Sequence, residues 1–213
     1  MAQSDEMLTW AGDNWLKRNK ADLGKHDPVC ALLDDMSIIL AGCKVVEIGC
    51  ADGWRLKKLQ HKYACQVIGL DPSRLACTEA LTHNGVLVRQ GIAAALPWPG
   101  EGLFDLVIMG FCMWMTEPSE WFRNVSESDR VLKDGGYLII HDYSEVRPLR
   151  HRYNYDSESA GHNDVWCYFF DWTKLWLVHP AYSVVRENMA LSNRETVSVL
   201  RKNLTNCVGT PGA

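Results

Sequence analysis

Apolar residues along the chain follow two spacings. Short runs rich in valine and isoleucine, typical of buried strands, alternate with longer runs that have the period of an amphipathic helix. The strand-like runs are KVVEIG (44–49), CQVIGLD (65–71), VLVRQ (86–90), FDLVIMG (104–110) and GYLIIHD (136–142). The helix-like runs are WRLKKLQHKY (54–63), PSRLACTEALTH (72–83) and PSEWFRNVSESDRVL (118–132). This alternation predicts βαβ crossovers and a buried parallel sheet.

Both ends of the chain depart from this rhythm. AYSVVREN (181–188) and ETVSVLRKN (195–203) read as two strands joined by a short polar loop, which predicts an antiparallel hairpin at the sheet edge. Residues 4–19 can form a helix with its apolar residues near one face. We therefore predict an α/β fold: a doubly wound, seven-stranded, mostly parallel sheet with a C-terminal antiparallel hairpin.

Residues 143–171 interrupt the alternation with a segment rich in tyrosine, histidine and tryptophan. Long loops in compact domains commonly act as lids or binding loops. We predict a lid or substrate insertion here, with His151, Tyr155 and His162 as substrate-binding candidates.

Composition narrows the classes of partner. The chain has 213 residues and a net charge of −4, which argues against nucleic acid as the main partner. Its longest apolar run, 106–115, is too short to cross a bilayer as a helix. The eight cysteines form no C-x-x-C pair and no zinc-ligand spacing. We expect reduced thiols, no metal, no membrane insertion and a cytoplasmic location.

The run VVEIGCADG places Glu47 at the end of the first predicted strand and Gly49 and Gly53 in the turn after it. Dinucleotide folds seat a pyrophosphate on G-x-G-x-x-G, whereas this turn has G-x-x-x-G beside a carboxylate that would repel an anion. Asp71 ends the second predicted strand, where an acidic side chain can accept hydrogen bonds from ribose hydroxyls. A ligand with a ribose, no phosphate and a positive charge fits both carboxylates, and S-adenosylmethionine is such a ligand.

VVEIGCADG, GLDPS, LPWPGEGLFDLVIMG and RVLKDGGYLIIHD resemble, in this order, the motifs of class I S-adenosylmethionine-dependent methyltransferases. The resemblance covers residues 44–142 and implies a Rossmann-like sheet with S-adenosyl-L-methionine as cofactor. Carried over residue by residue, it gives these cofactor-binding candidates: Glu47, Gly49, Cys50, Ala51, Gly53, Asp71, Pro72, Gly110 and Phe111.

One position departs from that pattern. Many relatives have G-D-A after the third strand, with the aspartate bonded to the adenine amino group, but this chain has Ile92 there. Ile92 could pack on the adenine face, and the backbone N–H of Ala93 could reach a ring nitrogen.

WAGDNWLKRN near the N-terminus and HDYSEVRPLRHRYNY after the fifth predicted strand resemble, more loosely, a subgroup that modifies sugars, polysaccharides or other small metabolites. This implies a helical cap over the cofactor at 1–43, followed by the methyltransferase domain at 44–213. Arg18 is the candidate for the methionine carboxylate, because a guanidinium binds a carboxylate bidentately.

Methyl transfer from a sulfonium depends mainly on positioning, with a base needed only if the acceptor loses its proton early. The catalytic candidates are His141, Asp142 and Tyr143, although a strand-end histidine can equally be structural. We expect methylation of an oxygen, or a nitrogen, of a small molecule. The alternatives are a non-catalytic S-adenosylmethionine-binding sensor or partner subunit and, less favoured, a nicotinamide oxidoreductase. A homo-oligomer stays open, because Trp121 and Trp176 could serve an interface or a core.

Overall fold

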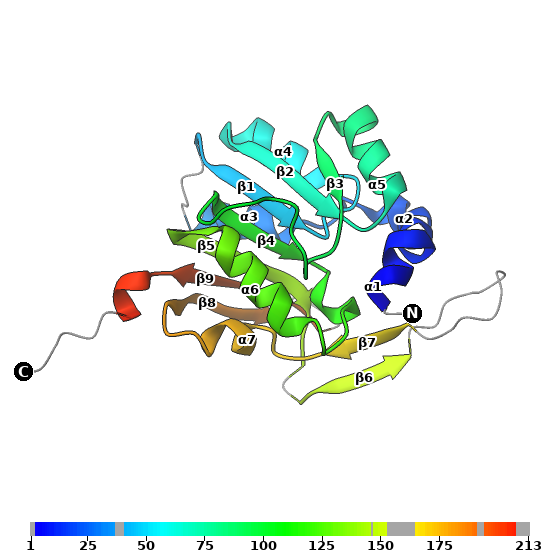
Figure 1. The fold of residues 1–213 in the computed structure, drawn as a ribbon. Helices are drawn as coiled ribbons and strands as arrows, with labels where there is room; N and C mark the ends of the chain where they lie inside the picture. The colour runs from blue at the N-terminus through cyan, green and yellow to red at the C-terminus, as the bar shows by residue number, and fades with distance from the viewer. Residues whose placement is uncertain (1–2, 37–40, 146, 153–164, 191–193, 208–213) are drawn as a thin grey trace, which may run out of the picture.

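The computed structural model describes residues 3–36, 41–145, 147–152, 165–190 and 194–207. A seven-stranded sheet in the order β3-β2-β1-β4-β5-β9-β8 forms its centre (Figure 1). The strands are β1 Lys44–Ile48, β2 Gln66–Asp71, β3 Val88–Gln90, β4 Phe104–Gly110, β5 Leu132–Tyr143, β8 Tyr182–Ala190 and β9 Glu195–Lys202. Strands β1 to β5 pair in parallel, whereas β9 runs antiparallel to both β5 and β8. The predicted sheet and its C-terminal hairpin are confirmed.

The helices lie where the apolar spacing predicts them, with additions. The helical elements are α1 Gln3–Glu6, η1 Met7–Ala11, α2 Gly12–Asn19, η2 Lys20–Asp22, α3 Pro28–Asp35, α4 Trp54–Tyr63, α5 Arg74–Glu79, η3 Ala80–Asn84, η4 Met113–Met115, α6 Trp121–Val131, α7 Thr173–Leu177 and η5 Leu204–Cys207. The Ser73 side chain accepts from the Ala76 N–H and caps α5. Helix α3, which the spacing does not predict, begins with Asp27 as its N-cap and Pro28 in its first turn.

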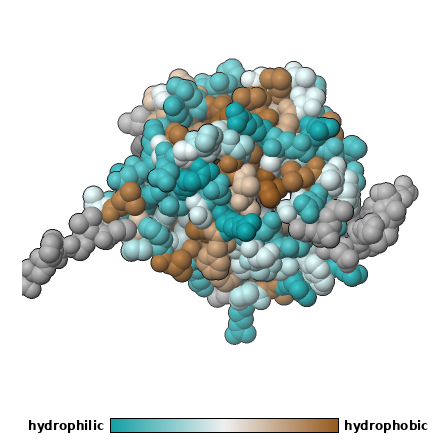
Figure 2. Space-filling model, in the orientation of Figure 1, coloured by the Kyte–Doolittle hydropathy of each residue, from teal (hydrophilic) through white to brown (hydrophobic). Residues whose placement is uncertain are grey.

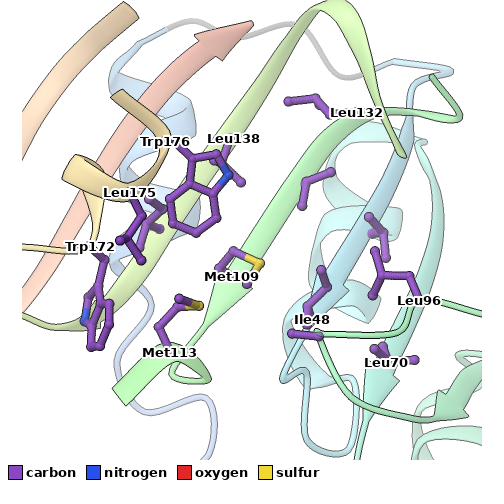
Figure 3. Close-up of a cluster of buried hydrophobic side chains, with 14 of the residues drawn as sticks. Ile48, Leu70, Leu96, Met109, Met113, Leu132, Leu138, Trp172, Leu175 and Trp176 are labelled. Atoms are coloured by element: carbon purple, nitrogen blue, oxygen red, sulfur yellow. The ribbon is translucent and has the colours of Figure 1, made fainter. Parts of the chain in front are cut away.

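Helices cover both faces of the sheet. Successive residues of the central strands point to opposite faces, so each strand contributes side chains to two cores. In β4, Val107 and Met109 belong to one core, and Leu106 and Ile108 to the other. The first core includes residues of α6 and α7, and Figure 3 shows Trp176 beside Leu138 and Met109. The second includes residues of α3 and α4. The carboxyl ends of the parallel strands are left for the connecting turns, where ligands bind in open α/β sheets.

The predicted insertion contains a strand pair. β6 (Leu149–Arg152) and β7 (Trp166–Phe169) form a separate two-stranded antiparallel sheet. His151 pairs with Cys167 within it, while Tyr155 and His162 lie outside the described residues. The described part of the predicted lid or substrate insertion therefore includes regular strand structure.

The surface in Figure 2 is largely hydrophilic, and apolar side chains gather there in separate patches. Within the described ranges, none of the helices has the length and apolar character needed to span a bilayer.

The turn after β1 depends on the missing side chain of Gly49. Its φ is +78°, and a Cβ there would lie 2.4 Å from the carbonyl oxygen of Gly110. Gly42 has a similar φ of +74°, but a Cβ added there would meet no atom of the described residues within 4 Å.

We predict that Gly49→Ala costs more stability than Gly42→Ala. Both variants carry the left-handed backbone penalty of about 1–2 kcal/mol, and only Gly49→Ala adds overpacking, worth about 1–3 kcal/mol. Urea unfolding of the two variants checks this. Equal losses of unfolding free energy in the two variants would show that the backbone around Gly49 and Gly110 moves apart without cost.

Candidate functional site

A cavity of about 520 Å³ lies at the carboxyl ends of β1, β2, β4 and β5. The sheet contributes the turn after β1, the tip of β2, the segment after β4 and the end of β5. The N-terminal segment completes the wall with residues between Ser4 and His26. The volume is within the range that small-molecule sites occupy.

The glycine turn brings backbone to the cavity wall. The Gly49 N–H donates to the Leu70 carbonyl oxygen at 2.8 Å, which ties the turn to β2. Gly49, Cys50 and Ala51 line the cavity, and Ala51 has a φ of +50°. Gly53, also predicted to bind cofactor, instead occupies the left-handed position that precedes α4 and is not among the lining residues. Its role in this geometry is to start the helix.

Asp71 is fixed by backbone. Its Oδ2 accepts from the Ala51 N–H at 2.8 Å and its Oδ1 from the Ser73 N–H at 2.9 Å. Burial raises the pKa of Asp71 to about 6, although these two N–H groups favour the charged form. Each carboxylate oxygen has two lone pairs, so Asp71 can still accept hydrogen bonds from a ligand.

Glu47 already has a cationic partner within the protein. Its Oε1 accepts from Nη1 of Arg55, and both side chains are buried. Gly110 makes room for the pair, because a Cβ there would lie 2.7 Å from Glu47 Oε1. Burial raises the pKa of Glu47 to about 7, and the Arg55 guanidinium acts in the opposite direction. Glu47 Oε2 has no hydrogen-bond partner in the described part of the chain. The sequence predicted that Glu47 favours a cation, and in the structure one of its oxygens pairs with a cation of the protein, Arg55, while the other has no partner among the described residues.

Arg55 extends this pair into a chain of buried polar groups. Its Nε donates to Asp27 Oδ1 at 3.2 Å, and its Nη2 lies 3.1 Å from His141 Nδ1. Because a guanidinium has only donors, Nδ1 must accept and Nε2 carries the proton. His141 Nε2 lies 2.7 Å from Glu195 Oε1, to which it donates. Burial lowers the pKa of His141, so the ring is held neutral with both nitrogens engaged.

The three catalytic candidates divide between the two faces of β5. His141 and Tyr143 line the cavity, and the Tyr143 ring lies 5.0 Å from that of Phe111. Asp142 is fully buried and is not among the lining residues. It accepts from the backbone N–H groups of Met113 and Tyr143, at 2.8 and 2.7 Å. Burial raises the pKa of Asp142 to about 8. Its geometry is that of a group that holds the turn after β4.

The N-terminal segment lies along the same cavity. Asp13 on α2 accepts from Ser73 Oγ at 2.6 Å and from the Leu75 N–H at 3.0 Å, which fixes α2 to the start of α5. Arg18, the predicted partner of a carboxylate, is exposed on α2 and does not line the cavity. This structure therefore does not bring Arg18 to the site.

The other cofactor candidates do meet at the cavity. Its walls include Pro72 beyond the tip of β2, Ile92 and Ala93 in the segment after β3, and Gly110 and Phe111 after β4. Phe111 has a φ of +48°. A positive φ is uncommon for a bulky residue, and residues with such strained backbone cluster at functional sites.

Several lining residues were not predicted. Arg55 could have been suspected, because it is a charged residue on the helix face that carries the buried Leu56 and Leu59. Glu195 comes from the terminal hairpin, and Trp114 and Asn124 from the segment between β4 and β5. Their spacing in the sequence carries no signal that they share one cavity.

The comparisons with known proteins agree with this geometry. A family model described as a methyltransferase domain matches residues 46–140. This segment is therefore similar to methyltransferase domains over somewhat less than half of the chain. An uncharacterised methyltransferase of Synechocystis is 34% identical over 105 residues, 49% of this chain and 49% of that protein. The chain spans about half the length of the curated relatives it matches, 42% and 49% in the first two.

Solved structures show the methyltransferase fold beyond the matched segment. A SAM-dependent methyltransferase of Methanosarcina mazei has a TM-score of 0.63 at 18% identity, covering 79% of this chain and 97% of that one. The [4+2]-cyclase SpnF has a TM-score of 0.60 at 14% identity, covering 83% and 80%. The matched family and the similar structures indicate S-adenosyl-L-methionine as the cofactor, as the sequence predicted.

We predict that Arg55→Leu destabilises the fold by about 3–5 kcal/mol, because it leaves Glu47 buried without its cation and removes one of the two cations that pair with Asp27. Lys58→Met is the matched control: Lys58 also pairs with Asp27, at 2.8 Å, but its side chain is 48% exposed. This control should cost less than about 1 kcal/mol. Denaturant unfolding measures both, and similar losses would contradict the central place of Arg55.

Proposed function

We propose that this chain is an enzyme that transfers a methyl group from S-adenosyl-L-methionine to an oxygen, or a nitrogen, of a small molecule such as a sugar or polysaccharide precursor. The observation that carries the proposal is that one cavity is lined both by the glycine turn with Asp71 and by the aromatic side chains Trp114 and Tyr143. In this proposal the first group forms the cofactor end and the second group forms the acceptor end. A site for donor and acceptor side by side needs these two environments.

The residues at the first end fit the cofactor. Asp71 can accept from the ribose hydroxyls, and Ile92 offers an apolar surface to the adenine. Glu47 Oε2, buried without a partner among the described residues, offers negative charge to the cationic part. With the cofactor bound, its sulfonium supplies an activated methyl group.

The rest of the catalytic contribution is positioning. Aligning two reactants can supply about 7–11 kcal/mol of the barrier. His141 can take a proton at Nδ1 only if the Arg55 guanidinium moves away from it. We therefore assign His141 a positioning role, in which it holds Arg55 and Glu195 in the cavity wall. Tyr143 is the catalytic candidate whose ring meets the acceptor end.

A non-catalytic cofactor-binding protein is the second candidate. One observation favours it: Ile92 stands where many relatives have the adenine-binding aspartate. Incubating the protein with methyl-labelled S-adenosyl-L-methionine and fractionated metabolite extract separates the two. A labelled product supports the enzyme, whereas tight binding without any labelled product supports the sensor or partner subunit.

Asp71→Ala should weaken binding of S-adenosylhomocysteine by about tenfold or more, because it removes a charged acceptor, and such hydrogen bonds are worth about 1.5–3 kcal/mol. Asp105→Ala is the control: Asp105 is the second residue of β4, at the amino end of the parallel strands and opposite the end that carries Asp71, and it pairs with Lys133 at 2.6 Å. Calorimetry on both variants and the parent checks this. Unchanged affinity in Asp71→Ala, or binding of NADH in place of S-adenosylhomocysteine, would overturn the cofactor placement.

Cofactor affinity should also depend on pH. Hydrogen bonds from the ribose favour the charged form of Asp71, whose pKa is about 6 in the empty cavity. The dissociation constant should therefore stay level above about pH 7 and rise as the pH falls through 6, approaching tenfold per unit. Titrations between pH 5 and 8 measure this, and Asp71→Ala should flatten the profile. An equally steep profile in that variant would assign the titration to another group.

A further inference from the structure

Asn124 is a buried amide in the wall of the cavity whose oxygen has no donor. It lies in α6, its side chain is 1% exposed, and it lines the cavity. Its Oδ1 is buried and has no hydrogen-bond partner among the described residues. A buried polar atom left in this state costs about 1–3 kcal/mol and calls for an explanation.

The neighbours of Asn124 fix which way its amide points. Thr116 Oγ1 donates its proton to the Met113 carbonyl oxygen at 2.9 Å, so toward Asn124 it can only accept. Asn124 Nδ2 donates to that Oγ1 at 3.2 Å and lies 3.6 Å from the sulfur of Met113. Rotating the amide by 180° would set its oxygen against these two acceptors. The oxygen is therefore the atom left without a partner.

Asn124 comes from α6, whereas the cofactor candidates that line the cavity come from the strand ends and the segments directly after them. Asn124 follows β4 by one helical segment, alongside Thr116 and Trp114 in the same wall. The Trp114 and Tyr143 rings, 5.1 Å apart and nearly perpendicular, give this end an aromatic surface. The ligand that fits is one with an apolar face and a hydrogen-bond donor, because only a donor satisfies an amide oxygen.

We infer that the side-chain oxygen of Asn124 binds a hydroxyl or amine hydrogen of the methyl acceptor. This inference rests on the proposed function for its biological meaning, but the binding itself does not require catalysis. Asn124 is then a specificity-determining residue: it selects acceptors that carry a donor, and it disfavours ether or methyl analogues of the same shape, which leave its oxygen unsatisfied.

Phenol and toluene form the matched probe pair, because they differ in a hydroxyl against a methyl group. Their affinities for the full chain, saturated with S-adenosylhomocysteine so that the cofactor end is filled, are measured by NMR titration. We expect phenol to bind about 3- to 10-fold more tightly than toluene, the ratio that one net hydrogen bond provides. The Asn124 side-chain amide resonance, assigned by its loss in Asn124→Leu, should shift with phenol and not with toluene.

Two variants complete the test. In Asn124→Leu, the affinity for phenol divided by the affinity for toluene should fall to one or below. Ser128→Ala, one turn further along α6 and equally buried at 1% exposure, should keep the wild-type ratio, since Ser128 does not line the cavity. If Asn124→Leu does not fold, Asn124→Asp supplies both the assignment by loss of the amide resonance and the comparison of affinities, and the wild-type ratio still decides.

Equal affinities for phenol and toluene, a preference that survives in Asn124→Leu, or no fragment binding at all would overturn the inference. Failure of S-adenosylhomocysteine to bind would instead count against the proposed function. In that case the same fragment titration on the chain without cofactor still tests Asn124.

Discussion

The buried guanidinium of Arg55 joins the elements that build the cavity. It contacts Glu47 from β1, Asp27 at the start of α3 and His141 from β5, and through His141 it reaches Glu195 on β9. Removing such charges from water is costly, so the arrangement persists only because each partner satisfies another. One side chain thereby fixes the relative positions of strands that are far apart in the sequence, and its neighbours form part of the cavity wall.

This network changes how charge acts in the site. Glu47 does not offer a whole negative charge to a ligand, because Arg55 compensates one of its oxygens. Asp71, at the tip of β2, has no side-chain cation among the described residues and is held instead by two backbone N–H groups. The more available negative charge therefore lies on Asp71, the side chain that we propose to bind the ribose. In that proposal the site relies on the ribose contact, because Ile92 cannot bind the adenine amino group.

The sequence predicts the sheet because strand burial and helix spacing are local properties of the chain. It also predicts most cofactor candidates, since Glu47, Gly49 and Asp71 follow directly from strand ends. Arg18 shows where this reasoning stops: a helix can be predicted from spacing, but the face it turns to the cavity depends on packing, here on the contact of Asp13 with Ser73. Glu195 and Asn124 could not be found either, because only the tertiary fold brings the terminal hairpin and α6 to the same cavity.

Strand alternation explains why the three catalytic candidates in β5 differ. His141 and Tyr143 line the cavity. Asp142, between them, points to the other face and accepts a hydrogen bond from the Met113 N–H in the segment after β4. That turn includes Met113, whose carbonyl oxygen orients Thr116, and Thr116 in turn orients Asn124. A chain of hydrogen bonds thus leads from a buried carboxyl to the amide at the acceptor end. The proposed cofactor end consists of glycine turns and strand tips, which the fold dictates. The proposed acceptor end consists of side chains on the segments between strands, which can change without disturbing the sheet. Under this proposal, acceptor specificity can vary on a constant cofactor site.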